Sequence, residues 1–317
     1  MLGDGAAQAA IVINRHAGCL RREPRLVSRL RSQASGRAQL YLTESAAELS
    51  GVAKEIARSD VLCVGIVGGD GTASSTLTSL WHEYAARPLP RIAFLRGGTM
   101  NTVASSIGIS ECPTSELLSR MLASVRAPET SRVHTRPAMI VGDQLGFLFG
   151  TGVWYGYLAE TYSSGQPTRL HNVAVLGRVL ASAAVGGSTY QRVLQRDVVS
   201  IRFEGGQWEQ RPYLAIAAST VAHAGFGFAP FHRALGVSDR FQLLAIKSGP
   251  RALIRDFPRL RLGQGLRDST AHDTLTSWAE LRAPQGCTFG YSVDGEIAPA
   301  TQALRLALGP VLEILAL

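Results

Sequence analysis

The feature that most constrains the fold is the segment Val61–Val67 together with the turn that follows it at once. The segment is apolar at every position except Gly65, and such runs are typical of strands buried on both faces of a parallel sheet. The turn, Gly68–Thr72, reads Gly-Gly-Asp-Gly-Thr, and its three glycines let the backbone adopt a tight strand-to-helix connection. Because a parallel strand of this kind needs helices on both faces of its sheet, these residues predict an α/β domain.

The residues on either side of this strand alternate between strand and helix patterns. Ser45 is followed three residues later by Glu48, a capping box that predicts a helix as far as about Arg58. Strands are expected at Ala10–Asn14, Gln39–Leu42 and Arg91–Leu95, and further helices at Arg22–Ala34 and Ala73–Ala86. This alternation predicts a doubly wound α/β domain.

From about residue 135 the pattern changes to short strands joined by turns. Two hairpins are expected, and their strands are Pro137–Val141 with Leu145–Phe149 and Val198–Phe203 with Tyr213–Ala218. Inserted helices are expected at Trp154–Tyr162, Val173–Ala184 and Ala252–Phe257. Pro258 is expected to shorten the last of these helices. The sequence thus predicts an α/β domain over residues 1–134 and an antiparallel, β-sandwich-like domain with inserted helices over residues 135–317, whose last strand could return to the first domain.

Charge limits the partners that this chain could bind. The 317 residues include 32 Lys and Arg against 24 Asp and Glu, a formal net charge of +8, and only Lys54 and Lys247 are lysine. An excess of basic over acidic residues favours anionic partners such as a nucleotide, a nucleic acid or an acidic membrane surface. It equally fits the arginine usage of a GC-rich genome.

Arg251, Arg255 and Arg259 recur every fourth residue with apolar residues between them. This stretch predicts a basic amphipathic helix on anionic lipid, or alternatively a solvated helix face. It has no interleaved stacking aromatics, so we expect no nucleic-acid partner.

Composition indicates a cytoplasmic protein. No apolar run reaches the ~18 residues of a membrane span, and Met1–Ala10 lacks the basic start of a signal peptide. The 4 cysteines form no Cys-x-x-Cys pair, which is typical of reduced thiols rather than of disulfides or a zinc site. If the protein meets a membrane, we expect it to bind from the surface.

Three loops at one edge of the predicted sheet carry unusual residues. Gly68–Thr72, Gly97–Asn101 and Asn14–Gly18 each follow a strand, and ligands of parallel sheets bind beyond the carboxyl ends of the strands. Successive amides at a helix start form an anion site, and the alternative explanation of each loop alone is an N-capping Asp70 or Thr99. The spacing fits neither a P-loop nor a dinucleotide-binding motif.

A fourth motif, Asp294-Gly295-Glu296, lies far along the chain. Its two carboxylates could supply a general base and a metal contact, whereas an Asp-Gly pair by itself is most often a hairpin turn. Both interpretations remain open from the spacing.

Together these motifs resemble the catalytic domain of diacylglycerol kinases, in the soluble bacterial lipid kinase branch that also includes sphingosine and ceramide kinases. Gly68–Thr72 matches the family's G-G-D-G-T without change, and Gly98–Ala104 matches G-T-x-N-x-x-A. Asn14–Gly18 matches the two ends of N-P-x-S-G, and Asp294–Glu296 matches the late D-G-E. The resemblance spans most of the chain in the family's order.

The resemblance implies a nucleotide-binding first domain, a lipid-binding second domain and an active site between them. It implies transfer of the γ-phosphoryl group of ATP to a lipid hydroxyl in phospholipid biosynthesis, with Mg²⁺ as cofactor and diacylglycerol as the default acceptor. It places at ATP the residues Asn14, Gly18, Thr43, Gly68, Gly69, Asp70, Gly71, Thr72, Gly98, Thr99 and Asn101. It makes Glu296 the proton acceptor, with Asp294 beside it and Asp70 positioning magnesium, its waters or the phosphates.

The chain departs from the family pattern at several positions. These are Arg15, Ala17, Ser75, Arg96, Thr102 and Ser238. Ser238 stands where the family has the Asp of its structural magnesium site, so Asp239 is the candidate metal ligand. Asp70, Thr99 and Glu296 are present, and we therefore expect an active kinase. The alternatives are a kinase of NAD, whose family shares G-G-D-G-T, and a non-catalytic protein that binds nucleotide or lipid.

Overall fold

The structure is a computed structural model that describes residues 8–85, 87–163, 168–185, 193, 197–225, 228–267 and 269–317. Residues 1–7, most of the segment in which we expect no signal peptide, lie outside this range. The chain divides into two compact units. The first contains the described residues up to Arg136 together with Val311–Leu317, and the second is Pro137–Pro310.

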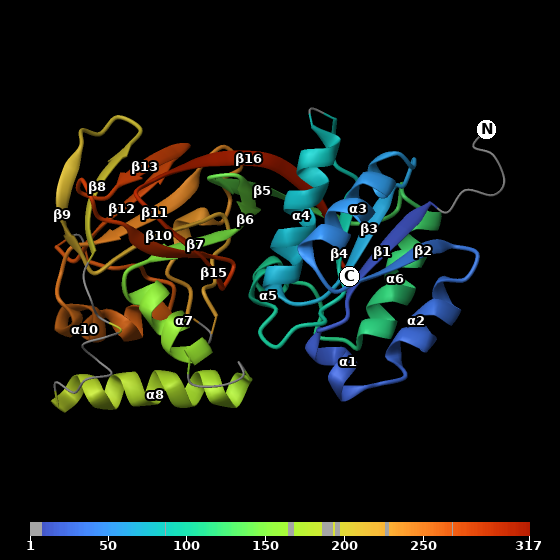
Figure 1. Ribbon diagram of the computed structural model, residues 1–317, viewed down its shortest axis with the longest axis horizontal. Helices are drawn as coiled ribbons and strands as arrows, with labels where there is room; N and C mark the ends of the chain where they lie inside the picture. The colour runs from blue at the N-terminus through green and yellow to red at the C-terminus, as the bar shows by residue number, and fades with distance from the viewer. Residues whose placement is uncertain are drawn as a thin grey trace. The chain divides into compact units, whose positions relative to one another are not determined.

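A parallel sheet forms the middle of the first unit (Figure 1). Its strands are β1 (Ala9–Asn14), β2 (Ala38–Thr43), β3 (Cys63–Val67) and β4 (Arg91–Phe94), in the order β2-β1-β3-β4. β3 is buried at every position, as its apolar sequence predicts. The strand order reverses between β1 and β3, and ligands of open α/β sheets bind at such a switch point.

Helices cover both faces of this sheet (Figure 1). The helices α1 (Gly18–Arg22), α2 (Leu26–Ala34) and α6 (Thr114–Arg126) lie together, as do α3 (Ala46–Ala57), α4 (Asp70–Tyr84) and α5 (Thr102–Ile107). The expected helix Arg22–Ala34 is in fact two helices, because Pro24 lies between them. At the start of α3 the amide of Glu48 donates to Ser45 Oγ at 3.2 Å, so the predicted N-cap is confirmed.

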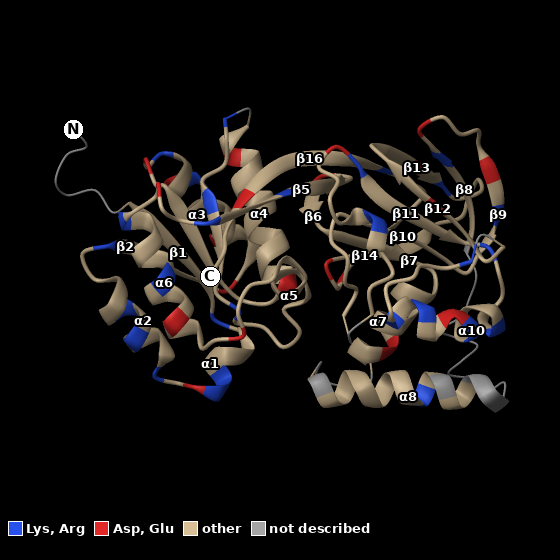
Figure 2. Cartoon of the chain, turned by 180° about the vertical axis from the view of Figure 1, so that it is seen from behind, with Lys and Arg blue, Asp and Glu red and all other residues tan. Residues whose placement is uncertain are grey.

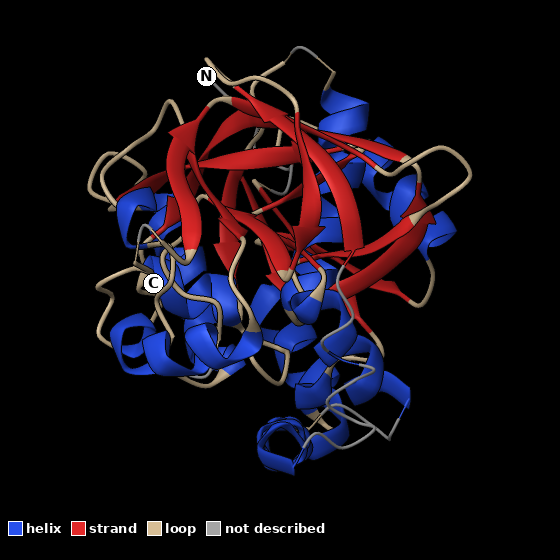
Figure 3. Cartoon of the chain, turned by 90° about the vertical axis from the view of Figure 1, so that its left-hand side faces the viewer, coloured by secondary structure: helices blue, strands red, loops and turns tan. Residues whose placement is uncertain are grey.

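The second unit contains two layers of antiparallel strands, which Figure 3 shows in red. One sheet has the order β12-β11-β10-β7-β14-β15. These strands are β7 (Leu148–Thr151), β10 (Ala215–Ser219), β11 (Phe241–Ile246), β12 (Ala271–Thr276), β14 (Phe289–Val293) and β15 (Glu296–Thr301). In the other layer β16 pairs with β13, β13 with β8, and β8 with β9, while β5 pairs with β16 and β6. Those strands are β5 (Val133–Val141), β6 (Gln144–Gly146), β8 (Asp197–Phe203), β9 (Glu209–Tyr213), β13 (Trp278–Arg282) and β16 (Ala303–Leu315).

One apolar core joins these two layers. Val199, Ile201 and Leu281 come from one sheet, and Phe149 and Phe241 come from the other. The parallel sheet of the first unit and this antiparallel sandwich confirm the expected fold class. Among the described residues of the second unit, the helices are α7 (Val153–Ser163), α8 (Arg169–Val185) and α10 (Pro250–Arg261), besides the short 3₁₀ helix η1 (His232–Ala234). No helix among the described residues is both long and apolar enough to cross a membrane.

Three local expectations are wrong in detail. β8 forms its hairpin with β9, whereas β10 belongs to the other sheet, so Tyr213–Ala218 is not the partner of Val198–Phe203. The expected strand Leu145–Phe149 is divided between β6 and β7, which pair in different sheets. α10 continues through Pro258 to Arg261. Pro258 removes one helical hydrogen bond, and the packing of the helix compensates for this loss.

The C-terminal strand β16 belongs to both units. Its first part pairs with β13 of the second unit. Its last part pairs in parallel with β4 of the first unit, with Ile314 opposite Ile92. The parallel sheet therefore gains its last strand from the end of the chain.

Candidate functional site

The loops after β1 and β3 meet at the switch point of the parallel sheet. Asn14 ends β1, and its Nδ2 donates to the Oγ1 of Thr72 in the first turn of α4 at 2.9 Å. Asn14 Oδ1 accepts from the amide of His16 at 2.8 Å, which closes a turn within the loop. Asn14 and Thr72, predicted to bind the same ligand, are thus brought into contact.

The two glycine-rich loops pack backbone against backbone. The amide of Gly97 donates to the carbonyl of Gly68 at 2.8 Å. A Cβ on Gly98 would lie 2.2 Å from the Cα of Gly69, and one on Gly97 would lie 2.6 Å from the nitrogen of Gly68. Side chains at these positions would push the loops apart, so glycine is required for the close approach.

Asp70 connects the two loops through its carboxylate. It accepts from the amides of Thr102 and Val103, at 2.8 Å to Oδ2 and 3.0 Å to Oδ1, at the start of α5. Burial raises the pKa of Asp70 above its ordinary value, while these amides and the charge of Arg96 act in the opposite direction. Asp70, expected among the catalytic residues, therefore holds α5 against the first turn of α4.

Arg96 supports the same region, and sequence reasoning noted it only as a departure from the family. Its backbone has φ +47°, and its side chain is only 6% exposed. The guanidinium donates to the carbonyl of Ile109, to Ser105 Oγ and to Glu111 Oε1 at 2.8–3.0 Å. No signal in the sequence alone places these acceptors together, because they follow Arg96 by 9 to 15 positions.

The N-terminus of α4 opens onto this region. Gly69 precedes the first helical residue, and the first amides of any α-helix have no intrahelical acceptor. A cavity of about 10 Å³, the size of one water molecule, is lined by Gly68, Gly69 and Asp70 of the first glycine loop, by Arg96, and by Asn101 of the second loop. The backbone of Asn101 is left-handed, and its side chain accepts from the Gly98 amide and donates to the Gly98 carbonyl. This arrangement can bind an anion through backbone donors.

The other residues predicted to bind ATP lie around the same edge. Thr43 ends β2 and is 5% exposed, and its carbonyl accepts from the amide of Arg15. A Cβ on Gly18 would lie 3.7 Å from Thr99 Oγ1. Cys19, which follows Gly18, donates its amide to the carbonyl of Gly97 at 2.9 Å. All three predicted loops thus converge within the first unit.

Asp294 and Gly295 form a hairpin turn in the second unit. They join β14 to β15, and their φ values of +49° and +87° are those of a two-residue type I′ turn. Asp294 is 6% exposed, and its carboxylate accepts from the amides of Phe147 and Leu148, with the closest contact at 2.8 Å. The carboxylate therefore fixes the turn to the start of β7.

Glu296 follows this turn as the first residue of β15 and is exposed. Tyr162 of α7 donates its hydroxyl to the Gly295 carbonyl at 3.1 Å. Burial, and secondly the charge of Glu296, raise the pKa of Tyr162 to about 12. Tyr162 is a neighbour of the predicted base that sequence reasoning missed, since only the fold brings α7 to this turn.

Asp239, the candidate metal ligand, is an exposed residue of the second unit. Its carboxylate is 78% exposed, and its nearest recorded ion pair is with Arg240 at 3.9 Å. Within the part of the chain that the structure describes, no three His, Cys, Asp or Glu side chains are grouped as metal ligands. We therefore assign no protein ligand set to magnesium.

Comparison with known proteins gives a match for the first unit. Residues 8–133 match the family model described as the diacylglycerol kinase catalytic domain. The chain is 28% identical over 251 residues to lipid kinase YegS of Escherichia coli strain K12, and the aligned region covers 77% of each chain. The Shigella flexneri protein named probable lipid kinase YegS is similar to the same extent.

The fold also resembles a solved structure. The crystal structure of a diacylglycerol kinase from Bacillus anthracis strain Sterne superposes with a TM-score of 0.63 at 14% sequence identity. The superposition covers 98% of this chain and 97% of the other. At that identity the likeness concerns the fold alone.

Proposed function

We propose that the protein, whose residues 8–133 match the family model of the diacylglycerol kinase catalytic domain, is an ATP-dependent lipid kinase, which transfers the γ-phosphoryl group to a lipid hydroxyl. The observation that carries this proposal is the convergence of Asn14, Thr72 and the two glycine loops at the first turn of α4. Diacylglycerol is the default acceptor.

The first unit supplies the binding of the phosphates. Backbone amides at a helix N-terminus attract negative charge without any side-chain cation, and the glycines let a phosphate approach the backbone closely. Asp70 acts as a positioning residue, because its carboxylate is already occupied by the amides of α5. When bound with ATP, Mg²⁺ supplies charge neutralisation on the phosphates.

The second unit supplies the acceptor of the proton. Glu296 is exposed, and the adjacent turn is fixed by Asp294 and Tyr162. A carboxylate held on a rigid turn can take the proton of the lipid hydroxyl as that oxygen attacks phosphorus, a contribution typically worth ~10²–10⁴ in rate. Asp294 positions this residue and does not itself meet the substrate.

The decisive test is phosphate transfer from labelled ATP with Mg²⁺ to lipids in mixed micelles. The panel contains diacylglycerol, monoacylglycerol, sphingosine, ceramide and phosphatidylglycerol, with NAD as a soluble acceptor. A labelled lipid supports the proposal and names the acceptor class. Label on NAD alone would assign the chain to the rival kinase, and ATP binding without any labelled product would indicate a non-catalytic protein.

The role of Glu296 is tested by Glu296→Gln. We expect kcat to fall at least a hundredfold with ATP affinity unchanged, because the amide cannot accept the proton. The matched control is Glu313→Gln, which changes an exposed glutamate of β16 in the same way. Near-full turnover of Glu296→Gln would refute the assignment.

We also propose that α10 rests on anionic lipid, with a different set of residues from the one expected. Arg259 folds back, and its Nε and Nη2 donate to the carbonyls of Gly265 and Gln264 at 3.2 and 3.3 Å. Arg251 and Arg255 are exposed on the helix together with Ile254, which is 44% exposed. Figure 2 shows blue basic positions along α10. Two cations beside an exposed apolar side chain suit a membrane surface.

This second proposal is tested by sedimentation with vesicles. Reversing both charges, Arg251→Glu with Arg255→Glu, should weaken binding to phosphatidylglycerol vesicles at least tenfold, since each arginine near such a surface is worth about 1 kcal/mol. The matched control reverses two exposed arginines of the first unit, Arg31 and Arg58. Equal losses in both double variants would show a net-charge effect and refute a docking role for α10.

A further inference from the structure

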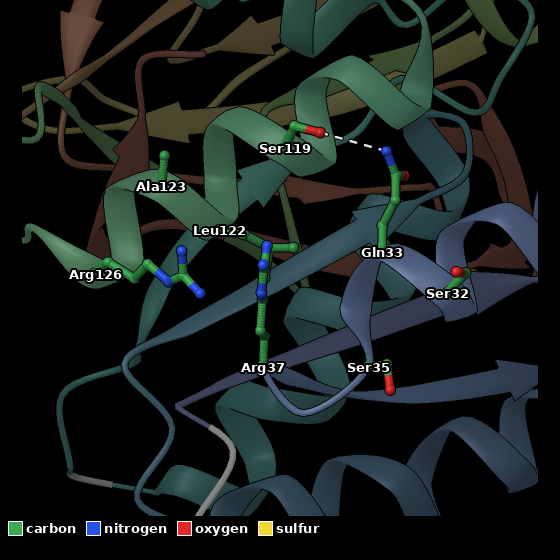
Figure 4. A pocket seen from close by; sticks show the side chains of 8 residues that line it. All are labelled: Ser32, Gln33, Ser35, Arg37, Ser119, Leu122, Ala123 and Arg126. Atoms are coloured by element: carbon green, nitrogen blue, oxygen red, sulfur yellow. Dashed lines mark hydrogen bonds between the residues drawn. The ribbon is translucent and has the colours of Figure 1, made fainter.

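A pocket of about 250 Å³ lies between α2 and α6 in the first unit, away from the glycine loops (Figure 4). Its polar lining consists of Ser32, Gln33, Ser35, Arg37, Ser119 and Arg126. Arg37 directly precedes β2, so the pocket is at the amino-terminal edge of the parallel sheet. The loops of the candidate site follow the carboxyl ends of β1 and β3. The two sites therefore lie at opposite ends of the strands of one sheet.

The pocket carries positive charge without an acidic residue in its lining. Arg29 of α2 pairs with Glu23 at 2.7 Å, and Arg120 of α6 pairs with Glu116 at 2.6 Å. By contrast, Arg37 and Arg126 form no ion pair within the described ranges, and Figure 4 shows both guanidinium groups directed toward the same space. Two like charges that share a pocket are stabilised by a bound anion.

The remaining wall offers hydrogen-bonding groups that are only partly used. Gln33 Nε2 donates to Ser119 Oγ at 3.4 Å, a contact that connects α2 to α6 (Figure 4). Gln33 Oε1 is buried and has no hydrogen-bond partner among the described residues. The hydroxyls of Ser32 and Ser35 can donate to an oxyanion in the pocket.

We propose that this pocket binds a phosphomonoester through Arg37 and Arg126. A guanidinium group donates two parallel hydrogen bonds to phosphate oxygens, and this geometry is specific for such anions. The volume is below the ~300–1,000 Å³ of pockets for drug-sized ligands, so it suits a phosphate with a small organic part. The phosphomonoester could belong to a soluble metabolite or to the headgroup of a lipid.

The binding is measured by isothermal titration of the full chain. The soluble probes are inorganic phosphate and glycerol 3-phosphate, and the lipid probe is phosphatidic acid in phosphatidylcholine vesicles, with pure phosphatidylcholine as the blank. Binding of a soluble probe assigns the site to a metabolite, whereas binding of the phosphatidic acid vesicles alone assigns it to a headgroup. Binding of none of these probes overturns the proposal.

The variants Arg37→Gln and Arg126→Gln locate the bound probe. Each should weaken binding about tenfold, the usual effect of losing one charge-assisted contact. Arg37→Lys, which keeps the charge and loses the paired geometry, should fall between wild type and Arg37→Gln. Arg31→Gln, an exposed arginine of α2 outside the pocket, should change affinity less than twofold.

The result that contradicts the site is equally specific. If phosphate binds with the same affinity to the wild type and to both glutamine variants, the anion occupies another place, such as the glycine loops. The proposal about this pocket stands or falls independently of the phosphotransfer reaction, because Arg37 and Arg126 have no part in it.

Discussion

Asp70 shows how one carboxylate can join two loops that are distant in sequence. It lies 32 positions before Thr102, whose amide it binds at 2.8 Å. Because the carboxylate is partly buried, the amides directed at it stabilise its negative charge. The loop geometry and the protonation state of this residue therefore depend on each other.

We expect Asp70→Asn to destabilise the first unit by about 1–3 kcal/mol, since an amide side chain presents a donor to one of the two amides that Asp70 accepts from. Phosphate transfer should fall as well, because α5 would no longer be held against α4. Urea unfolding and the micelle assay measure the two effects. Asp60→Asn, an exposed aspartate of the same unit, is the control and should leave both unchanged.

The close approach of the glycine loops makes a second residue testable. Gly98→Ala would place a Cβ 2.2 Å from the Cα of Gly69, so we expect ATP binding to be lost. Gly51→Ala is the matched control, because Gly51 lies inside α3 with nothing within 4 Å of its added Cβ. That control should stabilise the protein by up to about 1 kcal/mol. Unchanged ATP affinity in Gly98→Ala would show that the loops do not bind the nucleotide.

Among the elements, α10 depends on a single buried charge. Asp256 is 0% exposed, and its carboxylate accepts from Arg267 Nη1 and from Thr270 Oγ1. On the same side Leu253 packs in an apolar cluster, and Phe257 meets the ring of Phe228 edge-on at 4.8 Å. These contacts hold the helix to the second unit through the turn that contains Pro258.

Replacement of Arg267, the charged partner of Asp256, should weaken the attachment of α10 to the second unit. We expect Arg267→Gln to lower the free energy of unfolding by about 1–3 kcal/mol, because a buried carboxylate loses its charged donor. Arg255→Gln on the exposed face of α10 is the control for thermal and urea unfolding. Equal stability of Arg267→Gln and wild type would mean that Thr270 suffices.

At the scale of the whole molecule, the C-terminal segment Val311–Leu317 packs in the first unit and contributes to its core. Leu312, Ile314, Leu315 and Leu317 are between 0% and 6% exposed. The amide and hydroxyl of Ser110 both donate to the Leu317 carbonyl. Burial of such side chains contributes about 1.5–3 kcal/mol each, so together they rival the net stability of a typical domain.

A chain that ends at Pro310 should therefore lose the cooperative unfolding of the first unit and the ATP binding that we propose for it. The same reasoning predicts that residues 8–133 alone, the length of the matched domain, do not form a stable unit without this strand. Limited proteolysis and calorimetry measure the outcome, with Val311→Ser, at a 52% exposed position, as the control. Native-like melting of the shortened chain would contradict the prediction.

Several features of both units could be predicted because their signals are local. The buried strand Cys63–Val67, the N-cap at Ser45 and the Asp294–Gly295 turn each depend on residues within a few positions of one another. The pairing of β8 with β9 could not be predicted in this way. Several strands had compatible patterns, and the choice between them depended on which sheet buried each apolar face.

The sequence by itself determined the α/β and antiparallel parts, the three glycine- or asparagine-containing loops and the kinase resemblance, because backbone periodicity and turn chemistry are short-range properties. Only the tertiary structure decided what each polar side chain does. Asp70 binds α5, Arg259 binds its own loop, and Arg37 shares a pocket with Arg126. These roles depend on partners brought together by packing of distant segments, and the energies of such contacts are set by burial and distance rather than by sequence order.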